Sequence, residues 1–417
     1  MTFAEAIARI RRYDGRLHAF VRVFDRSDAT GPTFAVKDLI DVAGVPTGGG
    51  GRNPLDPAPV RTAPTVQRLL DDDWAMVGKT HTVELAYGAW GTNRAVGAPW
   101  NPWDSAVHRC PGGSSSGSAV AVAAGLCDLA LGTDTGGSVR IPASACGVVG
   151  LKPGMGLVPL AGVHPLAPSL DTVGTLAKSV AMAARGLGII AGDGGRGFNA
   201  ERALGAEARG RRVVALPLDQ LGEIRSDVQK LYAEAQRRLR EAGIEVIEAR
   251  PPRNFERYFE SNGVVMGGEG WRVRKAHIER HEADMDPAIV ARFRAGAAIT
   301  DEALARALET RSEFQAEFHG WLAQYDGMIL PSAPITAPPL TEVDEAGYPL
   351  SRLTRGGNYL DLPAISIPCG RGQDGMPAGL QIMGRPRDEE GLVALAAAFE
   401  RVSGWDGRTP DLSGFET

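Results

Sequence analysis

The stretch that decides the fold runs from Gly112 to Arg140 and reads GGSSSGSAVAVAAGLCDLALGTDTGGSVR. It opens on a run of glycine and serine, continues through small apolar residues, and enters a second run of glycines and hydroxyl side chains at Gly132. Residues 118–126 predict a helix of small side chains, and residues 129–131 predict a buried strand. Two loops that carry hydroxyl groups are therefore expected beside regular elements.

The second loop is suited to bind a negatively charged oxygen. It reads GTDTGGSVR from Gly132 onward. Because glycine has no Cβ, the backbone N–H groups of Gly136, Gly137 and Ser138 can converge on a single atom. An oxyanion hole requires such a group of amides, and Ser138 adds a hydroxyl to the same loop. Ser138 is therefore a candidate nucleophile.

A serine nucleophile needs a base, and the sequence favours lysine over histidine in this role. None of the seven histidines falls in either loop, and His108, just upstream, has no paired carboxylate motif. Arginine does not lose its proton in proteins, so it cannot serve as the base. The remaining candidates are the six lysines, Lys37, Lys79, Lys152, Lys178, Lys230 and Lys275.

Several separated motifs, taken in order, resemble those of the amidase signature enzymes, which are serine hydrolases of amides. The motifs are Phe34–Asp38 (FAVKD), Gly112–Ser118 (GGSSSGS), Gly132–Pro142 (GTDTGGSVRIP), Leu170–Gly174 (LDTVG), Leu362–Ala364 (LPA) and Gly379–Gln381 (GLQ). The 24-residue gap from Ser114 to Ser138 also agrees with the family. The resemblance extends from about residue 31 to about residue 400.

The resemblance implies a role for each matching residue. Ser138 is expected to be the nucleophile, Ser114 the bridging serine after a cis peptide bond, and Lys37 the base. The amides expected to form the oxyanion hole are those of Thr135, Gly136, Gly137 and Ser138. The implied enzyme is an amidohydrolase that cleaves a linear carboxylic amide through an acyl-serine intermediate. It releases ammonia or an amine and uses neither a metal nor an organic cofactor.

The proposed base places a definite demand on its surroundings. A lysine has an ordinary pKa of about 10.4, so a base that acts near neutral pH needs that pKa lowered by about three units. Burial away from carboxylates is the expected cause. The adjacent Asp38 would oppose the shift, but neighbouring residues on a strand point to opposite faces, so its charge is expected outside the pocket.

The substrate pocket is less well defined by the sequence. Arg140 either anchors a substrate carboxylate or braces the loop through hydrogen bonds, and the bracing role is favoured. Tyr87, Trp90 and Tyr359 are candidate pocket aromatics, although any one of them also suits the core. Asp361 occupies a position where the family commonly has glycine. If it borders the pocket, it is expected to repel acids and to favour amines.

We expect an α/β fold with one amidase-signature-type domain over residues 1–417, in which helices cover a mixed central sheet and form a cap-like insertion. Its expected parts are N-terminal helices (1–30), a catalytic core with the triad (31–200), a helical cap-like excursion (252–324) and a return to the core sheet (325–417). Residues 3–12, 17–24 and 176–190 are among the expected helices.

Composition excludes several other classes of protein. The 417 residues are 43% hydrophobic and 23% charged, which is typical of a globular chain. Lys and Arg number 45 against 50 Asp and Glu, so the net charge of −5 leaves no positive excess to attract a nucleic acid. No apolar run is long enough to span a membrane. We expect a cytoplasmic protein that binds a small-molecule amide and neither nucleic acid nor membrane, with a homodimer as a possible assembly.

Other motifs carry weaker signals. The four cysteines show no CxxC spacing and are expected to be free, buried thiols. His277 and His281 lie four residues apart, but position 278 is isoleucine instead of the glutamate of HExxH, so no metal site is expected. Residues 192–197 match GxGxxG without a surrounding βαβ pattern and predict a surface loop.

Two alternatives to a free-standing amidohydrolase stay open. One is the glutaminase subunit of a tRNA-dependent amidotransferase, which shares these motifs and needs partner chains. The other is a catalytically silent module that binds an anion on the loop amides. A phosphate-binding P-loop is disfavoured, because neither loop continues into GK[ST]. The acyl group and the leaving amine are not specified by the sequence.

Overall fold

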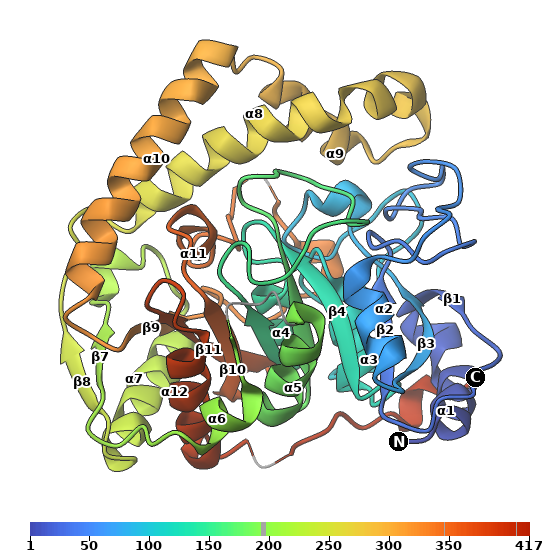
Figure 1. Ribbon diagram of the computed structural model, residues 1–417. Helices are drawn as coiled ribbons and strands as arrows, with labels where there is room; N and C mark the ends of the chain where they lie inside the picture. The colour runs from blue at the N-terminus through green and yellow to red at the C-terminus, as the bar shows by residue number, and fades with distance from the viewer. Residues whose placement is uncertain (193–196, 346, 406) are drawn as a thin grey trace.

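The computed structural model describes residues 1–192, 197–345, 347–405 and 407–417. Within them the centre of the molecule is an 11-stranded sheet (Figure 1). Its strands are β1 (Phe20–Val23), β2 (Thr33–Lys37), β3 (Ala75–Thr80), β4 (Leu129–Asp134), β5 (Val149–Lys152), β6 (Thr172–Ala177), β7 (Arg212–Ala215), β8 (Glu245–Glu248), β9 (Gly327–Pro331), β10 (Ala364–Arg371) and β11 (Pro377–Gly384).

The sheet is mixed. Its strand order is β1-β3-β2-β4-β6-β5-β10-β11-β9-β7-β8. Strand β2 runs parallel to β3 and β4, and β7 runs parallel to β8 and β9. The remaining neighbours pair antiparallel. The prediction of an α/β fold with a mixed central sheet is confirmed.

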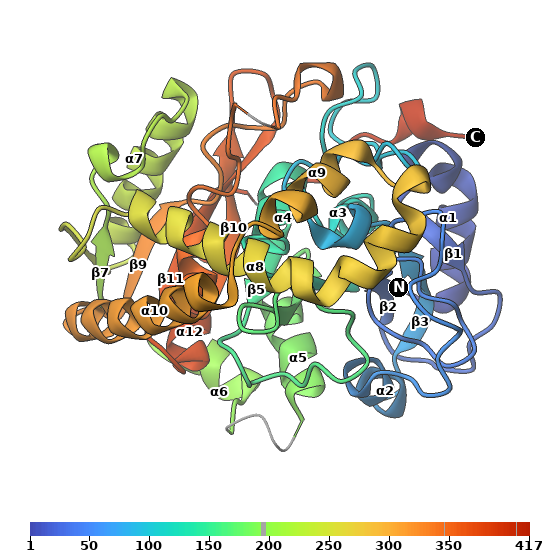
Figure 2. The same cartoon turned by 90° about the horizontal axis from the view of Figure 1, so that it is seen from above.

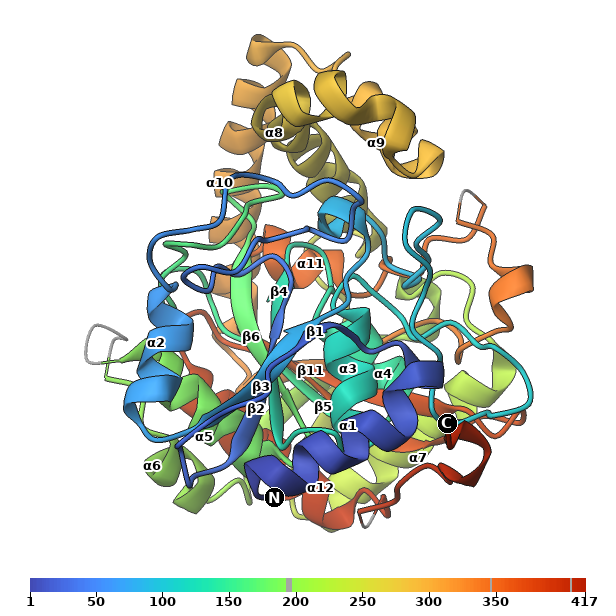
Figure 3. The ribbon, with the colours of Figure 1, turned by 90° about the vertical axis from the view of Figure 1, so that its right-hand side faces the viewer.

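Helices cover both faces of this sheet. They are α1 (Phe3–Leu17), α2 (Pro64–Asp71), α3 (Ser116–Ala123), α4 (Arg140–Cys146), α5 (Val180–Ala191), α6 (Ala200–Gly205), α7 (Ser226–Glu241), α8 (Glu256–His281), α9 (Pro287–Gly296), α10 (Asp301–Leu322), α11 (Arg355–Tyr359) and α12 (Glu389–Val402). Figure 3 shows α3 and α4 on one face and α2, α5 and α6 on the other. Three apolar clusters fill the interior, and the second of them includes the apolar residues of α3.

The parallel pair β2 and β4 positions the loops that the sequence singled out. Val36 of β2 is in register with Leu131 of β4, so both strands end at the same edge of the sheet. Lys37 is the last residue of β2, and Asp134 is the last residue of β4. Helix α3, whose residues are all buried, begins at Ser116, inside the first glycine-serine run. Both loops and the end of β2 therefore meet at one edge.

Three helices form a layer above this edge. Helices α8, α9 and α10 occupy most of the segment for which a helical excursion was expected, and they lie over the top of the sheet in Figure 1. Seen from above in Figure 2, α8 and α9 cross over the region of α3 and α4. Helix α8 packs against α9, α10 and α11.

Two expected helices are wrong in part. Residues 17–24 contain the end of α1 and then strand β1, because His18 adopts a left-handed conformation (φ 54°) that stops the helix and Phe20 then pairs with Thr80 of β3. Residues 176–190 contain the end of β6 before α5. That helix starts only after Ser179, whose side chain accepts a hydrogen bond from the Met182 amide and caps the helix.

Several smaller expectations can also be compared with the structure. All four cysteines are free and buried, as predicted. Residues 193–196 of the GxGxxG match lie outside the described residues. Among the described helices, none combines the length and the apolar character that a membrane crossing needs.

The close packing of the central strands makes one glycine position sensitive. A Cβ on Gly174 of β6 would lie 2.3 Å from the backbone oxygen of Leu151 on β5. Gly174→Ala is therefore expected to lower the free energy of unfolding by about 1–3 kcal/mol, because a backbone oxygen cannot move aside as a side chain does. Urea unfolding followed by circular dichroism measures the change.

The matched control is Gly205→Ala at the end of α6, where an added Cβ meets no atom within 4 Å. This variant is expected to unfold within about 0.5 kcal/mol of the native chain. Equal stability of the two variants would contradict the strand packing described above.

Candidate active site

Lys37 lies at the centre of the site and is fully buried. Its Nζ donates a hydrogen bond to Ser114 Oγ at 2.7 Å and another to Thr133 Oγ1 at 2.7 Å. The neighbouring Asp38 points away, as strand geometry predicts, and its carboxylate lies 2.7 Å from Lys79 Nζ. Lys37 forms no ion pair with any carboxylate in the described parts of the chain.

This environment favours the neutral amine. Burial lowers the pKa of Lys37 to about 7, and the negative charges of Asp134 and Asp171 oppose that shift only in part. The lowered pKa agrees with the demand placed on a lysine base. At neutral pH a substantial fraction of the side chain is therefore uncharged and able to accept a proton.

Ser114 is held by its backbone as well as by Lys37. The Gly113–Ser114 peptide bond is cis, as the resemblance implied. The Ser114 carbonyl accepts hydrogen bonds from the Val83 amide at 3.1 Å and from Thr82 Oγ1 at 3.0 Å. The next amide, of Ser115, donates to the Ser138 carbonyl at 3.1 Å and so joins the two glycine-rich loops.

The loop before Ser138 presents fewer free amides than expected. Gly137 has a φ of +127°, which favours glycine, and its amide donates to Asp134 Oδ1 at 2.7 Å. The expectation that this amide binds the oxyanion is therefore corrected, since it already has an acceptor. Within the described residues, the amides of Thr135, Gly136 and Ser138 donate to no protein acceptor, so these three are available to an oxyanion.

A buried ion pair holds this loop in place. Arg140 is fully buried, and its guanidinium lies 2.9 Å from the Asp134 carboxylate. It also donates to the side chains of Gln381 and Asn358, each at 2.6 Å. Burial alone would raise the pKa of Asp134, but the Arg140 charge and the hydrogen bonds that Arg140 and Asn358 donate to its carboxylate hold that pKa well below its usual range. Arg140 thus braces the loop and does not line the cavity, so the carboxylate-anchor role is corrected.

Asp171 supports the other side of the same loop. Its carboxylate accepts hydrogen bonds from Thr135 Oγ1 at 2.5 Å and from the amides of Leu166 and Ala167 at 2.9 and 3.0 Å. Burial raises its pKa to about 6 despite these bonds. Asp171 therefore braces the loop that precedes Ser138.

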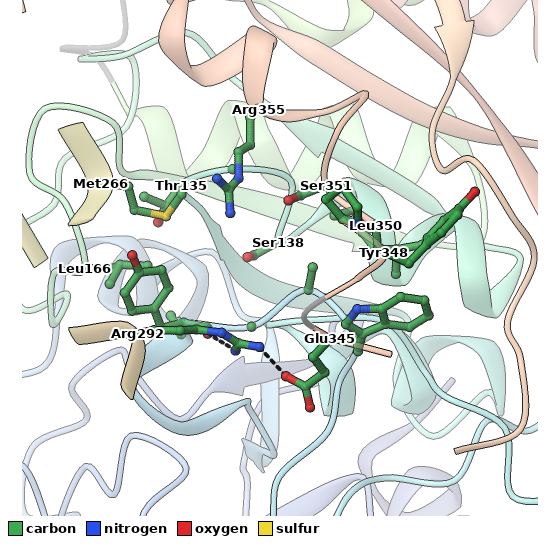
Figure 4. Close-up of a pocket in the computed structure, with 18 residues that line it drawn as sticks. Thr135, Ser138, Leu166, Met266, Arg292, Glu345, Tyr348, Leu350, Ser351 and Arg355 are labelled. Carbon is green, nitrogen blue, oxygen red and sulfur yellow. Dashed lines mark hydrogen bonds and ion pairs between the residues drawn. The ribbon is translucent and has the colours of Figure 1, made fainter. Parts of the chain in front are cut away.

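A cavity of about 110 Å³ opens beside Ser138 (Figure 4). Its wall contains the expected aromatics Tyr87 and Trp90, together with Met266 from α8 and Leu166. Three charged side chains also line it: Arg292, Glu345 and Arg355. The sequence motifs missed these charges, since they come from segments outside the two glycine-rich loops. For Arg292, the sequence indicated only that a charged residue lies in the segment expected to form the helical excursion.

Two other pocket candidates lie elsewhere. Tyr359 is fully buried, and its ring packs against Phe314 of α10 with 6.1 Å between centroids. The Asp361 carboxylate accepts a hydrogen bond from the Met155 amide at 2.7 Å. Neither residue lines the cavity beside Ser138. The expectation that Asp361 sets a preference for amines is therefore corrected.

Comparison with known proteins shows the family to which the chain belongs. A family model described as Amidase matches residues 1–393. The chain belongs to the amidase signature family. It is an amidase-family enzyme that acts on carbon–nitrogen bonds, and among the described residues no cluster of histidine, cysteine or acidic side chains is arranged to hold a metal ion.

Relatives of this amidase-family chain have diverse names. A glutamyl-tRNA(Gln) amidotransferase subunit of Methanosarcina mazei is 34% identical over 413 residues, covering 91% of this chain and 86% of that protein. The 2-amino-5-chloromuconic acid deaminase of Comamonas testosteroni is 32% identical over 395 residues, covering 92% and 84%. The peptide amidase of Stenotrophomonas maltophilia has a similar structure, with a TM-score of 0.81, 28% identity and coverage of 99% and 94%.

The bracing role of Arg140 in this amidase predicts a large effect on stability. Arg140→Met removes one partner of a buried ion pair and leaves the Asp134 carboxylate without its cation. The free energy of unfolding is expected to fall by about 3–5 kcal/mol. Urea unfolding at neutral pH measures it.

Arg11→Met serves as the control, because the Arg11 side chain is 72% exposed and its carboxylate partner lies 3.9 Å away. A change of at most about 0.5 kcal/mol is expected there. If Arg140→Met were as stable as this control, Arg140 would not brace the loop.

Proposed function

We propose that this chain hydrolyses a carboxylic amide through an acyl-enzyme intermediate on Ser138, with Lys37 as the base and Ser114 as the bridge between them. The observation that carries the proposal is the buried Lys37 amine, held 2.7 Å from Ser114 Oγ with no carboxylate paired to it within the described residues. A neutral amine in that position can accept a proton that Ser114 relays.

The proposed first step is acylation. Ser138 Oγ attacks the amide carbon, its proton passes to Ser114, and the Ser114 proton passes to Lys37. The carbonyl oxygen becomes negative and accepts hydrogen bonds from the free amides of Thr135, Gly136 and Ser138. The carbon–nitrogen bond then breaks, and the leaving nitrogen takes the proton back along the same path. Ammonia or an amine departs, and an ester on Ser138 remains.

Deacylation uses the same groups. Water attacks the ester carbon and gives a proton through Ser114 to Lys37. The bond to Ser138 breaks, the serine recovers its proton, and a carboxylic acid leaves. The link between the Ser114 and Ser138 hydroxyls is part of the proposal, and it is supported by the hydrogen bond that joins Ser115 to the Ser138 carbonyl.

A second candidate function is that of one chain in an amidotransferase assembly. The observation that favours it is the 34% identity to a glutamyl-tRNA(Gln) amidotransferase subunit. In that case the chain would release ammonia from glutamine for use by a partner. Vigorous hydrolysis of simple amides by the isolated chain supports the first candidate. The amidotransferase role is supported if glutamine is the one amide hydrolysed and if its hydrolysis requires partner chains.

The proton path predicts the effect of three substitutions. Ser138→Ala is expected to form no acyl-enzyme, and Lys37→Ala and Ser114→Ala are each expected to lower kcat/KM by about a thousandfold or more. Combining them is expected to add little, because the three residues act as a unit. Rates of ammonia or amine release measure the loss of activity. Intact-protein mass spectrometry, with an ester substrate whose acyl group leaves the enzyme slowly, detects the acyl-enzyme.

Ser116→Ala is the matched control, since its hydroxyl lies in the same glycine-serine run and is buried without a hydrogen-bond partner in the described structure. It is expected to retain nearly full activity. A native rate in any of the three path variants would exclude this assignment of roles.

The lowered pKa of Lys37 predicts the pH profile. The amine is protonated below its pKa of about 7 and cannot accept a proton there. We expect kcat/KM to rise about tenfold for each pH unit below that value and to level off above it. Stopped assays of ammonia release across this range measure the profile.

The Asp171 carboxyl titrates in the same pH range, because burial raises its pKa to about 6. Asp171→Asn removes that group, so the inflection attributed to Lys37 is expected to persist in this variant. A profile that becomes flat in Asp171→Asn would assign the inflection to Asp171 instead.

A further inference from the structure

The cavity beside Ser138 contains a cation that the proposed mechanism does not use. Arg355 is the first residue of α11 and lines the cavity together with Ser138. Figure 4 shows its guanidinium group directed into the cavity, on the side of Thr135 and Met266. The side chain also borders the oxyanion loop, because a Cβ on Gly136 would lie 3.1 Å from Arg355 Cγ.

The Arg355 guanidinium has no polar partner among the residues that the structure describes. Within the described residues its nitrogens make no hydrogen bond and no ion pair, and its Nε is buried without an acceptor. The guanidinium carbon lies over the ring of Phe259, 4.6 Å from the ring centroid. Stacking of this kind uses the face of the guanidinium and leaves the N–H donors at its edge unoccupied.

The other charges that line the cavity neutralise one another. Arg292 forms an ion pair with Glu345, drawn as a dashed line in Figure 4, and donates to the Tyr87 carbonyl at 2.6 Å. Glu345 also accepts a hydrogen bond from Thr92 at 2.6 Å. Arg355 therefore leaves the cavity with an uncompensated positive charge.

That charge persists at neutral pH. Burial lowers the pKa of Arg355 to about 10, which still leaves the group protonated in the pH range where Lys37 is neutral. A partly buried cation without a counter-ion is unfavourable, so an anion that enters the cavity gains by pairing with it. The planar fork of a guanidinium matches the two oxygens of a carboxylate.

We propose that the amide substrate carries a carboxylate, and that Arg355 binds it while Ser138 attacks the amide carbon. This inference rests on the proposed function and adds the substrate class to it. The preference is the reverse of the one that Asp361 would give if it bordered the pocket. Arg355 is a substrate-binding residue, whereas the paired Arg292 and Glu345 form part of the wall.

The test compares amides of one size and different charge. Succinamate carries a carboxylate, butyramide is neutral, and 3-aminopropionamide is cationic. For the native enzyme we expect kcat/KM for succinamate to exceed that for butyramide by about 10- to 100-fold. The cationic amide is expected to be the poorest substrate of the set. Malonamate and glutaramate extend the series to find the best separation between carboxylate and amide.

Variants at Arg355 then assign the preference. Arg355→Gln is expected to lower kcat/KM for succinamate by about 10- to 100-fold, chiefly through KM, and to leave butyramide nearly unchanged. Arg355→Lys keeps the charge without the fork and is expected to recover part of the loss. The control is Arg352→Gln, which removes an arginine three residues earlier that faces Glu256 at 3.7 Å and does not line the cavity. It is expected to keep the preference for succinamate.

A binding measurement separates this inference from the proposed function. Calorimetry with Ser138→Ala gives the Kd of succinamate and butyramide without turnover, and Arg355→Gln in that background is expected to weaken succinamate alone. Equal binding of the two amides, or an equal loss of both in Arg355→Gln, would overturn the role of Arg355. If succinamate binding depended on Arg355 but the native chain neither hydrolysed it nor formed an acyl-enzyme, the proposed function would be refuted. The anion site at Arg355 would then stand on its own.

Discussion

The site depends on keeping the Lys37 amine uncharged inside a protein that is rich in carboxylates. Burial provides the driving force, and the arrangement of neighbouring charges preserves it. Asp38, the adjacent residue, pairs with Lys79, and Asp134 pairs with Arg140. Each of the two carboxylates is therefore held by another cation, so neither forms a salt bridge with Lys37. The two ion pairs are part of the chemistry although neither is expected to contact the substrate.

The Asp134–Arg140 ion pair also shapes the loop that precedes Ser138. Asp134 accepts the Gly137 amide and two nitrogens of Arg140, which fixes the turn that precedes Ser138. Asp171 fixes the other end through Thr135. Because both anchors are buried, the amides that the proposed mechanism assigns to the oxyanion are held in position in advance. Preorganisation of this kind is what makes such a loop effective in catalysis.

The sequence predicted the three residues of the proposed proton path and two aromatic residues of the cavity wall, but not the charges that line the cavity. Lys37, Ser114 and Ser138 lie in short motifs with fixed spacing, and strand alternation was enough to place Asp38 on the opposite side. Arg292, Glu345 and Arg355 belong to segments whose approach to Ser138 depends on how α9, the chain before α11 and the sheet pack together. No local pattern encodes that packing. The boundaries at residues 17–24 and 176–190 depend instead on local features, the left-handed conformation of His18 and the serine cap at Ser179.

Lys37 and Asp134 end neighbouring strands of the central sheet, whereas Met266, Arg292 and Arg355 come from helices. The proposed function thus assigns reaction to the ends of these strands and the loops beside them, and recognition to helices. Mutational drift in the helical layer can exchange one ligand preference for another while the reactive apparatus stays intact. This modularity offers a physical reason why relatives with such different names share one scaffold, and it marks the helical layer as the place for directed evolution of new specificity.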